Sequence, residues 1–182
     1  MEESGAVYFL GDKYVDRVVR DGEVVYGRNL LLKTSGTWIV SSFHSWVNRS
    51  LDIPFEKINA KRGDTFTISE SIDSTESTLP VTTGFSELIA DGVNNLFLGE
   101  SIQNAIKVIN ATGKTSHSTA YGIRIFYLRQ ESGTNTNIAK YRKTKLELGA
   151  TATPYTVAPE DLFPSAQTLP SFPEWPEEGG GY

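Results

Sequence analysis

Short runs of β-forming residues, each ended by glycine, asparagine or aspartate, follow one another along most of the 182-residue chain. Residues 64–72, DTFTISESI, alternate apolar and polar side chains, and residues 121–129, YGIRIFYLR, carry β-branched and aromatic residues on both faces. The first pattern is typical of a strand with one buried face and the second of a central strand covered on both sides. Residues 95–98 and 105–110 are also predicted strands. The sequence therefore predicts an all-β fold, an antiparallel sandwich.

Two other predicted strands contain candidate functional residues. Residues 37–47, TWIVSSFHSWV, are predicted to form one strand with Trp38 and Trp46 on the same face. Residues 140–148 alternate as well, and we expect Lys145 and Glu147 to lie on the outer face of that strand as a solvated pair.

The segment 84–90, GFSELIA, is compatible with one or two helical turns, because the glycines and asparagines that follow it prevent a longer helix.

Residues 1–27 are predicted to form a small attachment element made of two hairpins. Gly11-Asp12 and Asp21-Gly22 supply the two turns, because Asp and Gly accept the positive φ of a tight hairpin turn. Valines flank the second turn on both sides. An isolated hairpin is only marginally stable in water, so we expect this element to pack against the main domain or another subunit.

The C-terminal residues change in composition. Five prolines fall between residues 159 and 182, which predicts an extended or disordered segment that joins neither a helix interior nor a central strand. We define residues 162–182 as an arm. Its large apolar side chains predict docking on a partner, because linkers have nothing against which to bury such groups. These docking residues are Leu162, Phe163, Leu169, Phe172 and Trp175.

Composition excludes several classes of function. The net charge of -5, without runs of like charge, argues against nucleic acid as a partner, and no apolar run approaches the length of a membrane span. Cysteine is absent and His44 and His117 are the two histidines, so thiolate chemistry and a histidine-rich metal centre are excluded. We expect a protein that is not an enzyme. A glycan hydrolase would require two facing carboxylates, which sequence cannot place.

An aromatic platform is the candidate binding site. Flat rings cover the apolar side of a sugar and planar polar groups bind its hydroxyls. The candidate carbohydrate-binding residues are Trp38, His44, Trp46, Asn48, Arg49, Tyr121 and Tyr127. The competing interpretation, that the tryptophans fill the core or an interface, is favoured about two to one by the frequency of buried aromatics. No cofactor is expected. Asp52, Asp64 and Glu147 are weak candidates for a structural Ca²⁺, because they lack the regular spacing of a calcium loop.

Three motifs in order resemble one known family. They are GRNLLL at residues 27–32, KRGDTFTIS at 61–69, and KLELG at 145–149 with TPYTVAPED at 153–161. Together they resemble the carbohydrate-binding-module-like jelly rolls of phage tail, baseplate and receptor-binding proteins that act on Gram-positive hosts. The family's aromatic after the last strand is usually Trp and is Tyr155 here.

The resemblance implies a jelly-roll domain over residues 28–161 and a virion protein assembled in the host cytoplasm. It implies other virion proteins as partners, a homotrimer or higher ring, and attachment to a host cell-wall polysaccharide. The alternative is a decoration or adaptor protein that cements capsid or tail subunits and binds no sugar. The arm after residue 161 goes beyond the family pattern and adds weight to a role in assembly.

Overall fold

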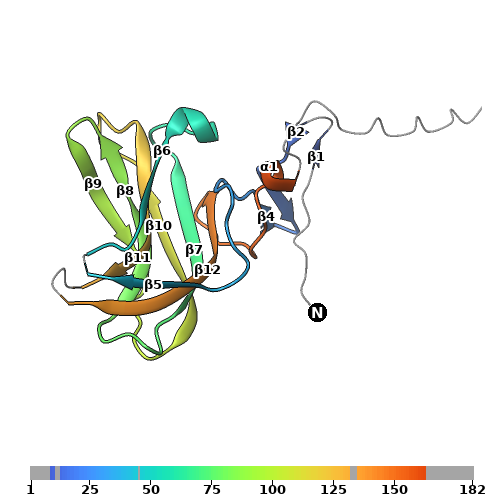
Figure 1. Ribbon diagram of the computed structural model, residues 1–182. Coiled ribbons are helices and arrows are strands. Elements are labelled where there is room, and N and C mark those ends of the chain that lie inside the picture. The colour runs from blue at the N-terminus through green and yellow to red at the C-terminus, as the bar shows by residue number, and fades with distance from the viewer. Residues whose placement is uncertain (1–8, 11–12, 45, 132–134, 163–182) are drawn as a thin grey trace, which may run out of the picture.

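The computed structural model describes residues 9–10, 13–44, 46–131 and 135–162. Two four-stranded antiparallel sheets pack face to face (Figure 1). The first sheet has the order β10-β7-β12-β5, and the second has the order β6-β11-β8-β9. The strands are β5 (Ile39–Phe43), β6 (Ser50–Pro54), β7 (Thr65–Asp73), β8 (Val81–Ile89), β9 (Gly92–Leu98), β10 (Ile106–Lys114), β11 (Gly122–Gln130) and β12 (Asn137–Leu148).

The strand order is that of a jelly roll. The first strand of the sandwich, β5, pairs with the last, β12, and pairing continues inward through β6 with β11, β7 with β10, and β8 with β9. A long hairpin folded over on itself gives this nested pairing, in which successive strands change sheet. The predicted all-β antiparallel sandwich is therefore confirmed, and its topology is the jelly roll that the family resemblance implies.

The core lies between the sheets and consists of the inward-facing positions of both. Phe66, Ile68 and Ile72 of β7 are fully buried, as the alternation of residues 64–72 predicts. Phe66 stacks on Phe55 of the short 3-10 helix η1 (Phe55–Ile58) and meets Phe85 of β8 edge-on. Apolar burial of this kind is the main stabilising contribution to such a domain.

Strands β8 and β11 are central to the second sheet and buried on both faces. The central position of residues 121–129 is confirmed. The helical turns considered for residues 84–90 are wrong, because this segment is part of β8. A strand covered on both sides needs no period-two alternation, so its apolar residues do not distinguish it from a helical turn.

Two β-bulges interrupt the inner strands. One lies in β11 between Phe126 and Arg129, and the other lies in β12 between Arg142 and Lys145, where Lys143 has a φ of 54°. The extra residue reverses the side-chain alternation from there on. Tyr141 therefore faces the core together with Leu146, although a regular strand would place them on opposite faces.

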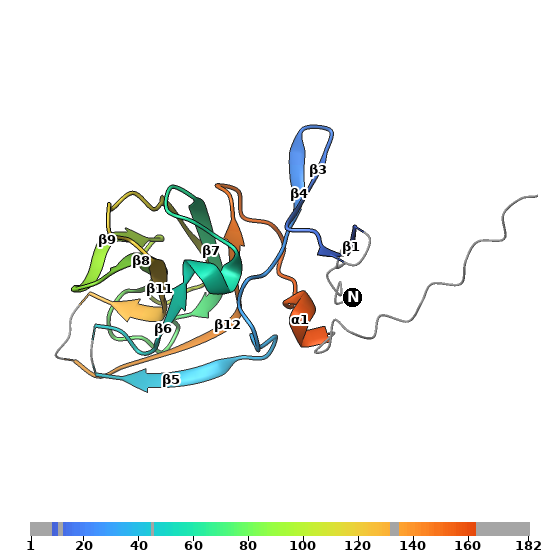
Figure 2. The same cartoon turned by 90° about the horizontal axis from the view of Figure 1, so that it is seen from above.

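The N-terminal residues form the expected small paired strands. Strand β1 (Phe9–Leu10) pairs with β2 (Lys13–Tyr14), and β3 (Arg17–Arg20) pairs with β4 (Glu23–Gly27) through a turn in which both Asp21 and Gly22 have positive φ. The β3–β4 hairpin projects from the side of the sandwich (Figure 2). Its tip leaves Val19 and Val25 exposed, whereas Tyr26 at its base is buried.

The chain after the last strand returns to the base of this hairpin and forms the short helix α1 (Pro159–Leu162) beside it (Figure 1). The prediction of an extended chain from residue 159 is wrong for this turn. Proline is compatible with the first helical position, where its missing N–H would have no partner in the helix.

Candidate functional site

The two tryptophans predicted to share one face lie on different sheets. Trp38 precedes β5 in the first sheet, and its ring lies 4.3 Å from the guanidinium of Arg142. Strand β5 ends at Phe43, and the chain then crosses to the second sheet, where the Trp46 carbonyl accepts a hydrogen bond from Gln130 N at 3.0 Å. The prediction of a single strand over residues 37–47 is wrong, because the crossover between sheets separates the two rings.

The other predicted binding residues are also dispersed. Tyr127 is buried between the sheets under the guanidinium of Arg49, and Tyr121 is half-exposed just before β11. His44 is exposed, and its Nδ1 lies 3.2 Å from the Thr136 hydroxyl. Asn48 donates its backbone N–H to Leu128 O at 2.9 Å. The seven residues therefore do not form one platform.

Trp46 instead forms one wall of a hollow of about 380 Å³ on the outer face of the second sheet. We call this hollow the Trp46 groove. Its polar lining comes from β8, β9 and β11, and its apolar lining includes Val93, Leu96 and Phe126. The polar residues are Ser86, Asn94, Asn95 and Arg129.

The indole of Trp46 is 53% exposed, and the Arg129 guanidinium lies 5.5 Å from its ring centroid. Backbone pairing fixes both residues, because Val47 forms a bridge with Arg129 next to the bond between Gln130 N and Trp46 O. A cation over an indole face is favourable and limits the motion of both side chains. The ring is therefore held in place while its surface remains open to a ligand.

Ser86 lies in the floor of the groove. It is 1% exposed, and its hydroxyl has no hydrogen-bond partner among the described residues. A buried hydroxyl without a partner is unfavourable by roughly 1–3 kcal/mol unless a water or ligand bonds to it. The groove therefore contains one polar group that a bound molecule can satisfy.

Asn94 and Asn95 line the β9 side of the groove. The register of β8 and β9 shifts between Ser86 and Glu87, and Asn95 has a φ of 46°. The buried carboxylate of Glu87 accepts a hydrogen bond from Asn95 Nδ2 at 2.5 Å and another from His117 N at 3.0 Å. This carboxylate fixes the irregular segment, because it joins β9 to the turn before β11.

Sequence reasoning found Trp46 but missed the other groove residues. Asn94 and Asn95 lie in or next to a segment identified only as a strand, and Ser86 lies in the segment interpreted as helical turns. An asparagine pair within an apolar strand pattern is a signal for a bulge, and bulges occur often beside binding sites. Arg129 has no local signal, because its pairing with Trp46 depends on the sheet.

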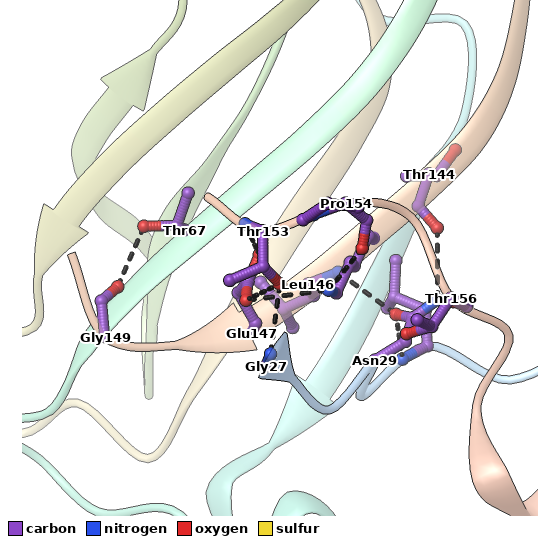
Figure 3. A network of polar contacts seen from close by, with 12 residues as sticks. Gly27, Asn29, Thr67, Thr144, Leu146, Glu147, Gly149, Thr153, Pro154 and Thr156 are labelled. Atoms are coloured by element: carbon purple, nitrogen blue, oxygen red, sulfur yellow. Dashed lines mark hydrogen bonds and ion pairs between the residues drawn. The ribbon is translucent and has the colours of Figure 1, made fainter. Parts of the chain in front are cut away.

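Lys145 and Glu147 are completely buried, so the prediction of a solvated outer pair is wrong. They do project from the outer face of the first sheet, but residues 153–156 and Tyr26 cover them. Figure 3 shows Thr153 beside the Glu147 carboxylate. Lys145 Nζ lies 3.6 Å from Glu147 Oε2 and donates to Pro154 O at 2.9 Å. Burial lowers the pKa of the Lys145 ammonium, and the neighbouring Glu147 carboxylate partly offsets this effect.

Asn29 is the second centre of this network and is fully buried. Its amide donates to Thr156 O at 3.0 Å and its Oδ1 accepts from Leu31 N at 3.0 Å and Leu146 N at 3.2 Å (Figure 3). Gly27 N donates to Thr153 Oγ1 at 3.0 Å, and this hydroxyl donates to Glu147 Oε2 at 2.8 Å. We call these contacts the polar lock, because they join the base of the hairpin, β12 and the chain after it.

The three candidates for a calcium ion do not lie together in one site. Asp52 pairs with Arg124, whose hydrogen bond lowers the pKa of that carboxyl group. Asp64 Oδ2 accepts from Lys61 N, and Glu147 belongs to the polar lock. Among the described residues, no group of three or more His, Cys, Asp or Glu side chains is placed to hold a metal ion.

The arm falls mostly outside the described residues. Leu162 ends α1 and is exposed, whereas Phe163, Leu169, Phe172 and Trp175 lie beyond the described chain. Docking by the arm stays a prediction. Across the described residues, no helix has the length and apolar character needed to cross a bilayer.

No protein-family model and no curated protein matches the sequence. Among solved structures, the chain is similar to the tripod (BppUct-A-L) from the baseplate of bacteriophage Tuc2009, with 16% sequence identity and a TM-score of 0.44. The match covers 74% of this chain and 59% of that chain, so the present chain spans less than two thirds of the length of its counterpart.

Proposed function

We propose that this chain is a phage virion component of the tail or baseplate, whose jelly roll binds a host cell-surface glycan through the Trp46 groove. The observation that carries the proposal is the half-exposed indole of Trp46, fixed by Arg129 beside the amides of Asn94 and Asn95.

The groove supplies both kinds of contact that a sugar ring requires. The indole and the side chains of Val93 and Leu96 offer apolar surface to the C–H face of a pyranose. The two asparagines, Arg129 and the Ser86 hydroxyl can bond to its hydroxyl groups. The volume of about 380 Å³ is near the lower end of the range of roughly 300–1,000 Å³ for small-molecule sites, which favours a short saccharide unit.

The proposed role as a virion component rests on the three sequence motifs and on the contacts between them in the fold. Asn29 of the first motif contacts Leu146 and Thr156 of the last, and Thr67 of the middle motif donates to Gly149 O. The first and last motifs thus meet at the polar lock, and the middle motif contacts the last motif at Gly149. This arrangement supports kinship with the phage modules that the motifs resemble. It also assigns the motif residues to the construction of the module and not to sugar recognition.

The test is binding of the purified full-length chain to cell walls and extracted wall polysaccharides of Gram-positive bacteria. Trp46→Ala should abolish saturable binding. Trp38→Ala is the matched control, because its ring lies on the other sheet and stacks on Arg142. Both variants need an unchanged circular dichroism spectrum. Equal loss of binding in both variants, or binding that survives in Trp46→Ala, would refute glycan binding by the Trp46 groove.

A purely structural role is the second candidate. It is favoured by the exposed valines of the β3–β4 hairpin and by Ile106 and Val108, which are exposed on edge strand β10. A decoration or adaptor protein would cover such residues with a neighbouring subunit. A homotrimer or larger ring measured by light scattering, together with incorporation into particles and no affinity for any wall fraction, would establish this role instead.

A further inference from the structure

A second pocket opens between the edge strands β5 and β6 of the two sheets. Its polar lining includes Lys33, Arg49, Tyr127, Tyr141, Arg142 and Thr144, and its volume is about 240 Å³. We call it the tyrosine pocket. We infer that the tyrosine pocket binds an oxyanion, a phosphate or carboxylate group carried on a small molecule or a sugar.

The two β-bulges build this pocket. The bulge in β11 precedes Arg129 and includes Tyr127, and the bulge in β12, between Arg142 and Lys145, includes Thr144. Lys143, at the β12 bulge, donates its N–H to Ser35 O at 2.7 Å and so holds the loop that closes the pocket. Bulges of two central strands at one cavity redirect side chains into it, and such irregularities are frequent beside functional sites.

The charges around the pocket are all positive. Lys33, Arg49 and Arg142 line it, no acidic side chain does, and none of the three forms an ion pair within the part of the chain that the structure describes. Unpaired cations that surround a cavity attract an anion. Arginine in particular binds planar or tetrahedral oxyanions through paired N–H groups.

The arginines are already positioned. The Arg142 guanidinium lies 4.3 Å from the Trp38 ring centroid, and its Nε is buried without a hydrogen-bond partner among the described residues. The Arg49 guanidinium lies 5.4 Å from the Tyr127 ring centroid. Stacking reduces the entropy that each side chain loses when a ligand binds.

The tyrosines supply hydroxyl donors. Their rings lie 5.4 Å apart, and burial raises the pKa of both phenols, so both remain protonated at neutral pH. The Glu70 carboxyl group contributes to the raised pKa of both phenols; it is fully buried and accepts a hydrogen bond from the Thr144 hydroxyl at 2.5 Å. Burial raises the pKa of Glu70 as well, and its carboxyl group does not line the pocket.

The size limits the ligand. A cavity of about 240 Å³ is smaller than the roughly 300–1,000 Å³ of most ligand sites, so it accommodates an anionic group and its attached ring, not a chain. A phosphorylated sugar and a uronic acid both present this chemistry. The inference goes beyond the Trp46 groove, because the two sites share no lining residue.

The test is calorimetric titration of the full-length chain with inorganic phosphate, glucose 6-phosphate and glucuronate, with glucose as the neutral control. We expect at least one anion, but not glucose, to bind to the Trp46→Ala variant, in which the Trp46 groove is disabled, and we expect the affinity for the anion to fall as salt is added. The preference between glucose 6-phosphate and glucuronate identifies the source of the oxyanion.

Arg49→Gln should weaken anion binding at least tenfold, which corresponds to about 1.4 kcal/mol. Arg49 is exposed, so this variant should fold. Arg129→Gln is the matched control, because Arg129 also lies over an aromatic ring, at 5.5 Å from Trp46, but outside this pocket. Absence of binding by the folded wild type, or equal effects of the two substitutions, would overturn the inference. Trp46→Ala should leave anion binding unchanged, so failure of this site and failure of the proposed glycan site can be distinguished.

Discussion

Replacement of Asn29 by alanine tests whether the polar lock stabilises the domain. Three backbone groups bond to this side chain at 3.2 Å or less, Leu31 N at 3.0 Å, Leu146 N at 3.2 Å and Thr156 O at 3.0 Å, and Thr144 O accepts a longer bond at 3.4 Å. Asn29 is fully buried, so water cannot replace the lost amide unless the segments separate. The substitution therefore leaves three buried polar groups without a partner.

Each buried group left unpaired costs roughly 1–3 kcal/mol. Three such groups, after local relaxation, should lower the free energy of unfolding by about 3 kcal/mol. In a protein of 150–250 residues, 1 kcal/mol corresponds to roughly 2–4 °C, so the melting temperature should fall by roughly 6–12 °C. This is a large fraction of the total stability of an ordinary domain.

The assay is urea denaturation followed by intrinsic fluorescence, with the slope of the transition compared between variants. Asn110→Ala is the matched control, because Asn110 is exposed on edge strand β10 and should change stability by less than about 0.5 kcal/mol. A loss below about 1 kcal/mol for Asn29→Ala, or one equal to that of the control, would show that the polar lock does not stabilise the fold.

Three other predictions concern buried groups and the hairpin. The raised pKa of Glu70 means that the folded state holds its proton more tightly, so this group's contribution to stability is complete below pH 4.5 and is lost as pH rises through the folded-state pKa. Glu70→Gln should therefore stabilise the protein increasingly at higher pH, and melting curves at pH 4 and pH 8 would show this; an effect independent of pH would contradict it. Gly27→Ala should severely destabilise the protein, because an added Cβ would overlap the Glu147 carboxylate. Gly22→Ala has free space around the added Cβ and should cost about 1 kcal/mol of stability, because Gly22 has a φ of 84°. Equal melting temperatures for these two variants would refute the close packing at Gly27. Glu147→Ala should lower the free energy of unfolding by about 3–5 kcal/mol, because it leaves the buried ammonium of Lys145 without its charged partner. The further change Lys145→Met should recover part of that loss in chemical denaturation. A simple loss of packing would not be recovered in this way.

The polar lock explains what the sequence motifs encode. Asn29, Glu147 and Thr153 stand at motif positions. Asn29 bonds to Leu146 N across 117 residues, and Gly27 N bonds to Thr153 Oγ1 across 126 residues, whereas Thr153 bonds to the nearby Glu147. Residues with this role join the two ends of the jelly-roll domain. The candidate sugar-binding surface lies on the other sheet and contains none of them.

The sequence alone determined the class of the fold and many of its parts. Period-two alternation identified β7, β-branched and aromatic residues on both faces identified β11, and Asp21-Gly22 identified the hairpin turn, because each signal is local and depends on a few neighbouring residues. It also identified Trp46 as a candidate ligand contact.

Only the tertiary structure decided which surfaces remain free. Lys145 and Glu147 alternate like an exposed pair, but a segment from the end of the chain and the base of the hairpin cover them. Trp46 and Trp38 have the spacing of one strand face, but the crossover between the sheets places them apart. Bulges shift the alternation in β11 and β12. In each case the deciding contact comes from residues distant in sequence, and period-two alternation carries no information about what packs on a strand from outside.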